Sequence, residues 1–240
     1  MAQEFVPLQN AQQIENLGRL ELCSTSQKTE AEQFMSLSEI DINDDLPDQH
    51  DNPPELQRWL DAARSRLSRY WDQFKEKPLP QYIECDFEYV ATALKYCCDQ
   101  DLIDGRLFVE WGCGFGVVAG VAGLLGLDAI GIEAEEFLCE QARLLLDQEG
   151  ISAEIWQGNF LPEGARDLAE PEDPLVSLTH YIQSAYEQQD FSLSDFAIVF
   201  VYPWPGEEHF LKLVFDRFAR RDALLLLYRG PYQIELYRKN

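Results

Sequence analysis

Basic side chains are scarce in this sequence. Its 240 residues hold 19 lysines and arginines against 43 aspartates and glutamates, which gives a formal net charge of −24 at pH 7. Proteins bind DNA and RNA backbones mainly through lysine and arginine contacts with phosphates, and an acidic surface repels those backbones. We therefore expect no nucleic-acid partner. Cationic partners, such as basic proteins, amines and sulfonium compounds, suit the charge better.

Long apolar runs and paired metal ligands are also lacking. Residues 1–16 contain neither the basic nor the apolar segment of a secretory signal, and the longest uncharged stretch near the core, residues 117–127, is too short to span a bilayer. The six cysteines form no CxxC pair and no cysteine–histidine spacing for zinc. With 46% hydrophobic and 12% aromatic residues, the sequence is typical of a globular protein. We expect a cytoplasmic protein without a metal site or a membrane contact.

The first part of the sequence is acidic and helical. Residues 29–57 contain no lysine or arginine while acidic residues accumulate there, which predicts a solvated loop or linker. Apolar residues then recur at helical spacing over residues 51–74 and again over residues 87–100. We assign residues 1–80 to a helical and acidic N-terminal extension and residues 81–240 to a second domain.

From residue 107 onward, strand patterns and helix patterns alternate. Short apolar runs predict strands, and the longer amphipathic segments between them predict helices. The expected strands are residues 107–111, 129–133, 153–157, 196–203, 223–228 and 232–239, and the expected helices are residues 117–126, 135–150, 175–189 and 206–221. This alternation predicts an α/β fold with a mostly parallel, Rossmann-like sheet and helices on both faces.

The last strand limits one edge of this sheet. After the strand over residues 223–228, the sequence has room for a single further strand. We expect that strand to be antiparallel and to form the C-terminal edge of a short sheet. Such an edge is open to a homodimer contact or to cover by the N-terminal helices.

A glycine-rich loop follows the first strand of the alternation. Residues 109–116 read VEWGCGFG, a pattern ExGxGxG that begins at Glu110. Alternating glycines let a ligand approach the backbone closely, and ligands of open α/β sheets bind at this end of the strands. A Walker A loop needs a lysine that is absent here, and the dinucleotide pattern GxGxxG needs a glycine where Val117 stands. These departures argue against a nucleotidase and against a dinucleotide-dependent oxidoreductase.

The pattern resembles the first motif of the class I S-adenosylmethionine-dependent methyltransferases, and the resemblance extends over the second domain. It implies S-adenosyl-L-methionine as the cofactor and methyl transfer as the activity. This cofactor carries no phosphate, which fits a loop without lysine. By resemblance, Glu110 supports the loop and faces the ammonium group of the cofactor. The loop residues expected to hold its methionyl and ribose parts are Gly112, Cys113, Gly114 and Gly116.

Two further segments match the same family. Glu133 ends the second expected strand, where a carboxylate accepts hydrogen bonds from the ribose hydroxyls, and Ala134 would lie against adenine. Asn159 and Phe160 follow the third strand, where the family binds the adenine amino group with a polar side chain and the ring with the next backbone N–H. The alternatives are structural. Glu133 would then be a favourable charge at a helix N-terminus, and Asn159 a turn residue.

The acceptor side is expected after the fourth strand, where residues 201–209 read VYPWPGEEH. The tRNA guanine-N7 methyltransferases have Asp-Pro-Trp-Pro at this point, and Tyr202 replaces the acidic residue here. That departure and the negative charge argue against tRNA as the acceptor. Tyr202 and Glu207 are the candidates for catalytic proton transfer, and Trp204 is the candidate wall of the substrate pocket. Alternatively, the prolines and acidic residues only begin a helix.

The segment before the helix over residues 87–100 often covers the cofactor in this fold. Tyr82 and Asp86 are therefore candidates for contact with it, although the N-cap of that helix is the better interpretation of Asp86.

These patterns together predict a cytoplasmic S-adenosylmethionine-dependent methyltransferase whose acceptor is unidentified. The charge favours a small molecule or a basic protein side chain over nucleic acid. The alternative is a catalytically inactive homologue that still binds the cofactor and acts as an interaction protein, because Tyr202 departs from the family pattern.

Overall fold

The computed structural model describes residues 36–47, 52–73, 82–170 and 182–240. The expected domain boundary at residues 80 and 81 lies outside these ranges and stays a prediction. The first part of the expected helix over residues 175–189 also lies outside them, and among residues 182–189 the structure has a helix only at Ala185–Gln188.

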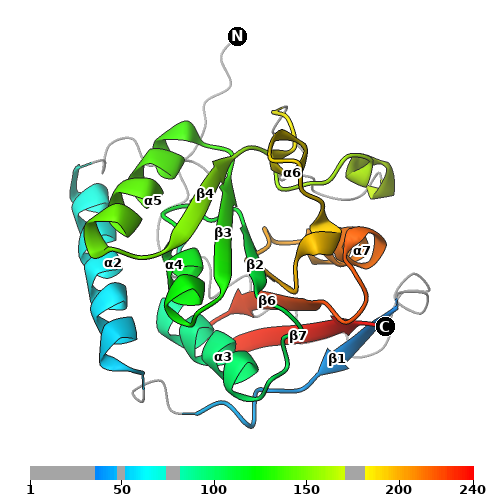
Figure 1. The fold of residues 1–240 in the computed structure, drawn as a ribbon, viewed down its shortest axis with the longest axis horizontal. Helices are drawn as coiled ribbons and strands as arrows, with labels where there is room; N and C mark the ends of the chain where they lie inside the picture. Colours follow the sequence, from blue (N-terminus) through cyan, green and yellow to red (C-terminus); the bar gives the residue numbers. More distant parts are fainter. Residues whose placement is uncertain (1–35, 48–51, 74–81, 171–181) are drawn as a thin grey trace. The chain divides into compact units, whose positions relative to one another are not determined.

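One sheet organises the described part of the chain, in the order β1-β7-β6-β5-β2-β3-β4 (Figure 1). The strands from β2 to β6 run parallel to their neighbours, whereas β7 is antiparallel to β6 and β1 is antiparallel to β7. The expected mostly parallel α/β fold is therefore confirmed. The strands are β1 (Leu37–Ile40), β2 (Leu107–Trp111), β3 (Asp128–Glu133), β4 (Ala153–Gln157), β5 (Ile198–Val201), β6 (Leu224–Gly230) and β7 (Gln233–Lys239).

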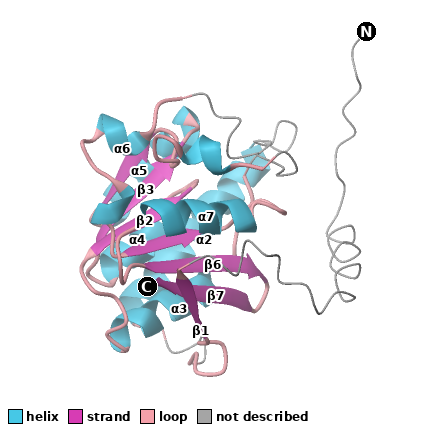
Figure 2. Ribbon diagram, turned by 90° about the vertical axis from the view of Figure 1, so that its right-hand side faces the viewer, coloured by secondary structure: helices cyan, strands magenta, loops and turns pink. Residues whose placement is uncertain are grey.

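Helices cover both faces of the sheet (Figures 1 and 2). Buried residues of α2, α3, α4 and α5 form one hydrophobic core with one face, and buried residues of α6 and α7 form a second core with the other. The helices are α2 (Pro54–Gln73), α3 (Phe87–Asp99), α4 (Val117–Leu124), α5 (Glu136–Glu149), α6 (Ala185–Gln188) and α7 (Glu208–Phe218), with short 3-10 helices at Ala165–Leu168 and Leu193–Asp195. Within the described ranges, no helix is both long enough and apolar enough to cross a membrane.

The central strand β2 shows how the sequence divides the two cores. Successive side chains of a strand point to opposite faces of the sheet. Phe108 belongs to the core beneath α2 to α5, whereas Val109 and Trp111 belong to the core beneath α6 and α7. Glu110 therefore shares the face of Phe108, beneath α4, and this alternation aims its carboxylate at the start of that helix.

The helix α2 is docked on α4 by one tryptophan. The Trp59 ring lies against Gly120, where an added Cβ atom would be 2.2 Å from a ring carbon. Its indole N–H donates a hydrogen bond to the carbonyl of Val117 at 2.9 Å. Residues 36–240 form one compact unit, so α2 belongs to the same unit as the sheet.

The strand β1 corrects two expectations about the edge of the sheet. Residues 29–57 are expected to be a solvated loop, yet Leu37–Ile40 pair with β7 from Leu37 opposite Lys239 to Ile40 opposite Leu236. The expected C-terminal strand β7 is antiparallel but is not the outermost strand, because β1 lies beyond it (Figure 1). The space that we expect at this edge for a homodimer contact or for helices is thus occupied by β1.

Candidate functional site

The glycine loop joins the end of β2 to the start of α4. Gly112, Gly114 and Gly116 have φ angles of +68°, +54° and +70°. These values lie in the left-handed region, which residues with a Cβ atom adopt only with strain. The alternating glycines are therefore required by the backbone of the loop itself, apart from any ligand.

The three glycines have different surroundings. A Cβ atom added to Gly112 would meet no described atom within 4 Å, so the backbone is open to a ligand there. A Cβ atom on Gly116 would lie 3.1 Å from side-chain carbons of Ala142 and Ile155, so this glycine allows close packing of α4. At Gly114 the neighbour is the ring of Tyr82. The ligand-facing part of the loop is therefore centred on Gly112.

Glu110 supports the loop from below. It is 5% exposed, and its carboxylate accepts a hydrogen bond of 2.7 Å from the backbone N–H of Ala119 in the first turn of α4. Burial raises the pKa of Glu110 well above its usual value, the Ala119 bond opposes that shift, and the charge of Glu133 adds to it. The expected supporting role of Glu110 agrees with this geometry, and its contact with a cofactor stays a prediction.

Glu133 is the second carboxylate of the site. It ends β3, which pairs with β2, and it is 9% exposed. One oxygen accepts the backbone N–H of Gly114 at 2.8 Å, and the other accepts those of Ala134 and Glu135 at 2.7 and 3.0 Å. Glu133 thus binds backbone amides of the glycine loop and of the start of α5. Its expected ribose contact, and the adenine contact of Ala134, stay predictions.

Cys113 faces away from the open part of the loop. Its side chain lies over Gly131 of β3, where an added Cβ atom would be 2.7 Å from the sulfur. Burial, followed by the charges of Glu110 and Glu133, raises the pKa of the Cys113 thiol well above its usual value. A ligand in the loop can therefore meet the backbone of Cys113 but not its sulfur.

Asn159 and Phe160 follow β4, as expected, and both make contacts within the protein. The Asn159 side chain accepts a hydrogen bond from the backbone N–H of Leu161 at 2.9 Å, and the residue is 6% exposed. The Phe160 ring is stacked on Trp111, with centroids 5.3 Å apart and planes at 11°. The Asn159 backbone forms an isolated parallel bridge with Ser184. The expected adenine contacts of both residues stay predictions.

The expected acceptor residues lie after β5. The rings of Tyr202 and Tyr228 meet edge to face, with centroids 4.9 Å apart, and the Tyr228 hydroxyl accepts the backbone N–H of Asp86 at 3.2 Å. Burial, with a smaller effect of Cys85, raises the pKa of Tyr202. Tyr202 is therefore a neutral hydroxyl at physiological pH, near the segment that precedes α3.

The two remaining acceptor candidates differ in exposure. Trp204 is half-buried, whereas Glu207 is 0% exposed at the start of α7. Its neighbour Glu208 faces Arg229 at 3.6 Å and accepts the backbone N–H of Gly206 at 3.1 Å. Glu207 and Glu208 thus begin α7, as acidic residues commonly do. The roles of Trp204 and Glu207 toward an acceptor stay predictions.

Asp86 and Tyr82 flank the segment that leads into α3. The Asp86 carboxylate accepts the backbone N–H of Tyr89 at 3.0 Å and caps the helix. The N-cap interpretation of Asp86 is thus confirmed. Tyr82 lies on the glycine loop, a contact that the spacing of the sequence does not reveal because the two segments are joined through α3 and β2.

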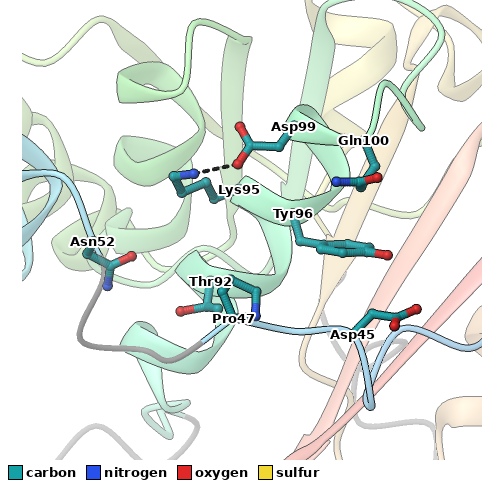
Figure 3. Close-up of a pocket in the computed structure, with 8 residues that line it drawn as sticks. All are labelled: Asp45, Pro47, Asn52, Thr92, Lys95, Tyr96, Asp99 and Gln100. Carbon is teal, nitrogen blue, oxygen red and sulfur yellow. Dashed lines mark hydrogen bonds and ion pairs between the residues drawn. The ribbon is translucent and has the colours of Figure 1, made fainter.

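Two cavities of the described part lie outside this site. One of about 290 Å³ lies between the second half of α3 and the segment before α2 (Figure 3). Lys95 is paired with Asp99 there, and the Tyr96 side chain is hydrogen-bonded to Asp45. The other, of about 470 Å³, is lined mainly by residues around α6 and by the end of α7. Neither includes a residue of the glycine loop, so we assign neither to the candidate site.

Comparison with known proteins gives a local sequence match. No protein-family model matches the sequence. Over 91 residues the chain is 31% identical to a ubiquinone biosynthesis O-methyltransferase from Roseobacter denitrificans, and the match covers 35% of this chain and 37% of that protein. The chain therefore matches well under half of the length of this curated relative.

Two solved structures of methyltransferases are similar to part of the chain. An RNA methyltransferase from Salinibacter ruber in complex with S-adenosyl-L-homocysteine has 16% identity and a TM-score of 0.43, over 67% of this chain and 91% of that one. A putative caffeoyl-CoA O-methyltransferase from Staphylococcus aureus has 12% identity and a TM-score of 0.43, over 75% and 68%.

The sheet and the glycine loop have the features that the sequence predicts. The strand order around β2, the antiparallel β7 and the glycine loop with acidic residues at the ends of β2 and β3 are all present, and the local sequence match is to a methyltransferase. The chain therefore has a Rossmann-like α/β fold, and its glycine loop resembles the first motif of the class I S-adenosylmethionine-dependent methyltransferase superfamily.

Proposed function

We propose that this protein transfers a methyl group from S-adenosyl-L-methionine to an acceptor. The observation that carries the proposal is the open backbone at Gly112 between two buried carboxylates, Glu110 and Glu133. Phosphates are not favoured beside two carboxylates. A phosphate-free ligand with an ammonium group, a sulfonium group and a ribose diol suits these acidic side chains and the close approach to the backbone.

The transfer is an in-line displacement at the methyl carbon. A lone pair of the acceptor forms the new bond to the methyl carbon while the carbon–sulfur bond breaks, and the bonding electrons stay on sulfur. The sulfonium cation becomes a neutral thioether, and the acceptor gives up a proton if it was protonated. Orientation and exclusion of water supply most of the acceleration in such a step.

Tyr202 is the residue that we place beside the acceptor. Because burial raises its pKa, it donates a hydrogen bond to the acceptor rather than removing a proton. General-base catalysis is needed only when the nucleophile is protonated. Glu207 is the candidate base for that case, with Trp204 as a wall of the acceptor pocket.

The acceptor that we favour is a small molecule or a basic protein side chain. The net charge of −24 supports this choice over nucleic acid. The curated relative is by name an O-methyltransferase of ubiquinone biosynthesis, which adds support for a small-molecule acceptor.

Calorimetry with S-adenosylmethionine, S-adenosylhomocysteine and NAD tests the donor. We expect both adenosyl ligands to bind and NAD not to bind. Glu133→Gln should weaken the binding of both adenosyl ligands, because an amide nitrogen replaces one acceptor oxygen. The matched variant Glu136→Gln should not weaken it, since Glu136 is exposed on α5. Binding of NAD alone would overturn the proposal, and equal effects of the two variants would reduce Glu133 to a charge at a helix N-terminus.

The acceptor is tested by transfer of a labelled methyl group from S-adenosylmethionine. The wild-type protein is incubated with a metabolite extract and with basic proteins, and the label is followed into both fractions. We expect label to appear in one of them and to decrease in Tyr202→Phe. Donor binding without transfer to any fraction would favour the alternative of an inactive, cofactor-binding interaction protein.

A further inference from the structure

An aromatic side chain from outside the glycine loop lies directly on it. A Cβ atom added to Gly114 would be 2.4 and 2.9 Å from two ring carbons of Tyr82. The ring is therefore in contact with the loop backbone, and a glycine is needed beneath it. Tyr82 belongs to the segment between α2 and α3, so this segment contributes a side chain to the loop.

Other aromatic rings hold Tyr82 in this position. Its ring centroid lies 5.1 Å from that of Phe115 in the loop and 6.0 Å from that of Trp71 in α2. The indole N–H of Trp71 donates to the carboxylate of Glu84, and Phe115 also meets Tyr70 edge to face at 5.3 Å. The Tyr82 ring is thus fixed between the end of α2 and the loop.

The space next to this ring suits a cation. The ring lies on Gly114, two residues along the loop from the open backbone of Gly112. The Glu133 carboxylate accepts the N–H of the same Gly114, and the Glu110 carboxylate accepts the N–H of Ala119 at the start of α4. Burial, followed by the negative charge of Glu84, raises the pKa of Tyr82 well above its usual value. The Tyr82 side chain is therefore a neutral phenol at physiological pH.

We propose that Tyr82 distinguishes the methyl donor from its demethylated product through contact of its ring with the sulfonium group. This inference rests on the proposed function. Aromatic faces attract cations, and the sulfur loses its positive charge when the methyl group leaves. The ring therefore strengthens binding of S-adenosylmethionine but not of S-adenosylhomocysteine. A residue outside the glycine motif thus favours release of the product after transfer.

The measurement is the ratio of the two dissociation constants, that of S-adenosylhomocysteine over that of S-adenosylmethionine, by calorimetry on the full chain. Loss of the ring in Tyr82→Leu should lower this ratio by about 2- to 30-fold, the range expected for one cation–aromatic contact. Tyr82→Phe keeps the ring and should keep the ratio. Tyr82→Met serves as a second non-aromatic variant if the leucine variant does not fold. Tyr232→Leu, which removes a ring that is 75% exposed on the β6–β7 turn, is the matched control.

Each other outcome has one meaning. An equal loss of affinity for both ligands in Tyr82→Leu and Tyr82→Met would show that the ring packs against the ligand without sensing its charge, and would overturn the inference. Tighter binding of both ligands would show that the ring occupies the ligand position in the free protein, and would overturn it as well. If the wild-type protein binds neither ligand, the proposed function fails, and this result is distinct from the other two.

Discussion

The carboxylate of Glu133 and the backbone N–H of Gly114 are joined by a hydrogen bond of 2.8 Å. Glu133 ends β3, and Gly114 lies between β2 and α4, so this bond ties the ends of two neighbouring strands together. The residue that the family resemblance assigns to the ribose therefore also shapes the loop. The effects of replacing Glu133 therefore have to be measured on both stability and ligand binding.

Glu133→Ala should lower the free energy of unfolding by about 1–3 kcal/mol, because three backbone N–H groups lose their acceptor in a mostly buried place. Chemical denaturation gives this value. Glu136→Ala is the control, since Glu136 lies three residues further along the chain and is exposed. An unchanged midpoint for Glu133→Ala would contradict the loop-shaping role.

The glycines of the loop should separate stability from binding. Gly116→Ala combines a φ of +70° with contacts of 3.1 Å to Ala142 and Ile155, and we expect a loss of about 2 kcal/mol of stability. Gly112→Ala has the strained φ of +68° alone, and about 1 kcal/mol is expected. Gly112→Ala should nevertheless weaken the binding of S-adenosylmethionine more than Gly116→Ala does, because the alanine methyl group enters the open space. Denaturation measures the loss of stability and calorimetry the loss of binding. A larger loss of stability in Gly112→Ala together with a larger loss of binding in Gly116→Ala would exclude this division of roles.

Glu110→Gln should change the pH dependence of stability. Because burial raises the pKa of Glu110 in the folded state, the folded protein keeps a proton that the unfolded chain releases. Stability therefore falls as the pH rises above the unfolded value of about 4.5. A glutamine cannot ionise, and its carbonyl oxygen can still accept the Ala119 N–H. In denaturant titrations, we expect the stability of Glu110→Gln relative to wild type to increase from about pH 4 to about pH 7. A difference in stability that does not change with pH would argue against a raised pKa.

Trp59→Phe should loosen α2 from the sheet. The change removes the hydrogen bond from the indole to the Val117 carbonyl and part of the ring that lies on Gly120. We expect a loss of about 1–2 kcal/mol in the free energy of unfolding. Arg58→Ala, at an exposed neighbouring position, should have little effect. Equal effects of the two substitutions would mean that Trp59 does not anchor the helix.

The central part of the fold could be predicted because its signals are local. The apolar runs of β2, β3, β4 and β6 and the amphipathic helices between them have the periods of buried strands and covering helices. β1 could not be predicted in this way. Its four residues lie in an acidic stretch, and its pairing partner β7 is almost the whole chain away. Pairing between such distant segments leaves no periodic signal of its own.

The candidate site could likewise be predicted from the sequence only in part. The motif identifies Glu110, Glu133 and the glycines, because the spacing along one loop and two strand ends is visible in the sequence. The motif does not distinguish the open backbone of Gly112 from the packed backbone of Gly116, since this difference depends on Ala142 and Ile155 in other elements. The contact between Tyr82 and Gly114 is hidden for the same reason.

The pairing of β1 with β7 brings residues 36 and 240 together. The backbone N–H of Asn240 donates to the carbonyl of Ser36 at 2.7 Å, so a short peptide would join the two positions without moving either strand. A circularly permuted form of residues 36–240, closed there and opened in an exposed turn such as the one at Tyr232, would keep the strand order of the sheet. In that chain β1 would follow β7 directly as the second arm of a hairpin, and the most distant pairing of the fold would become one of its most local.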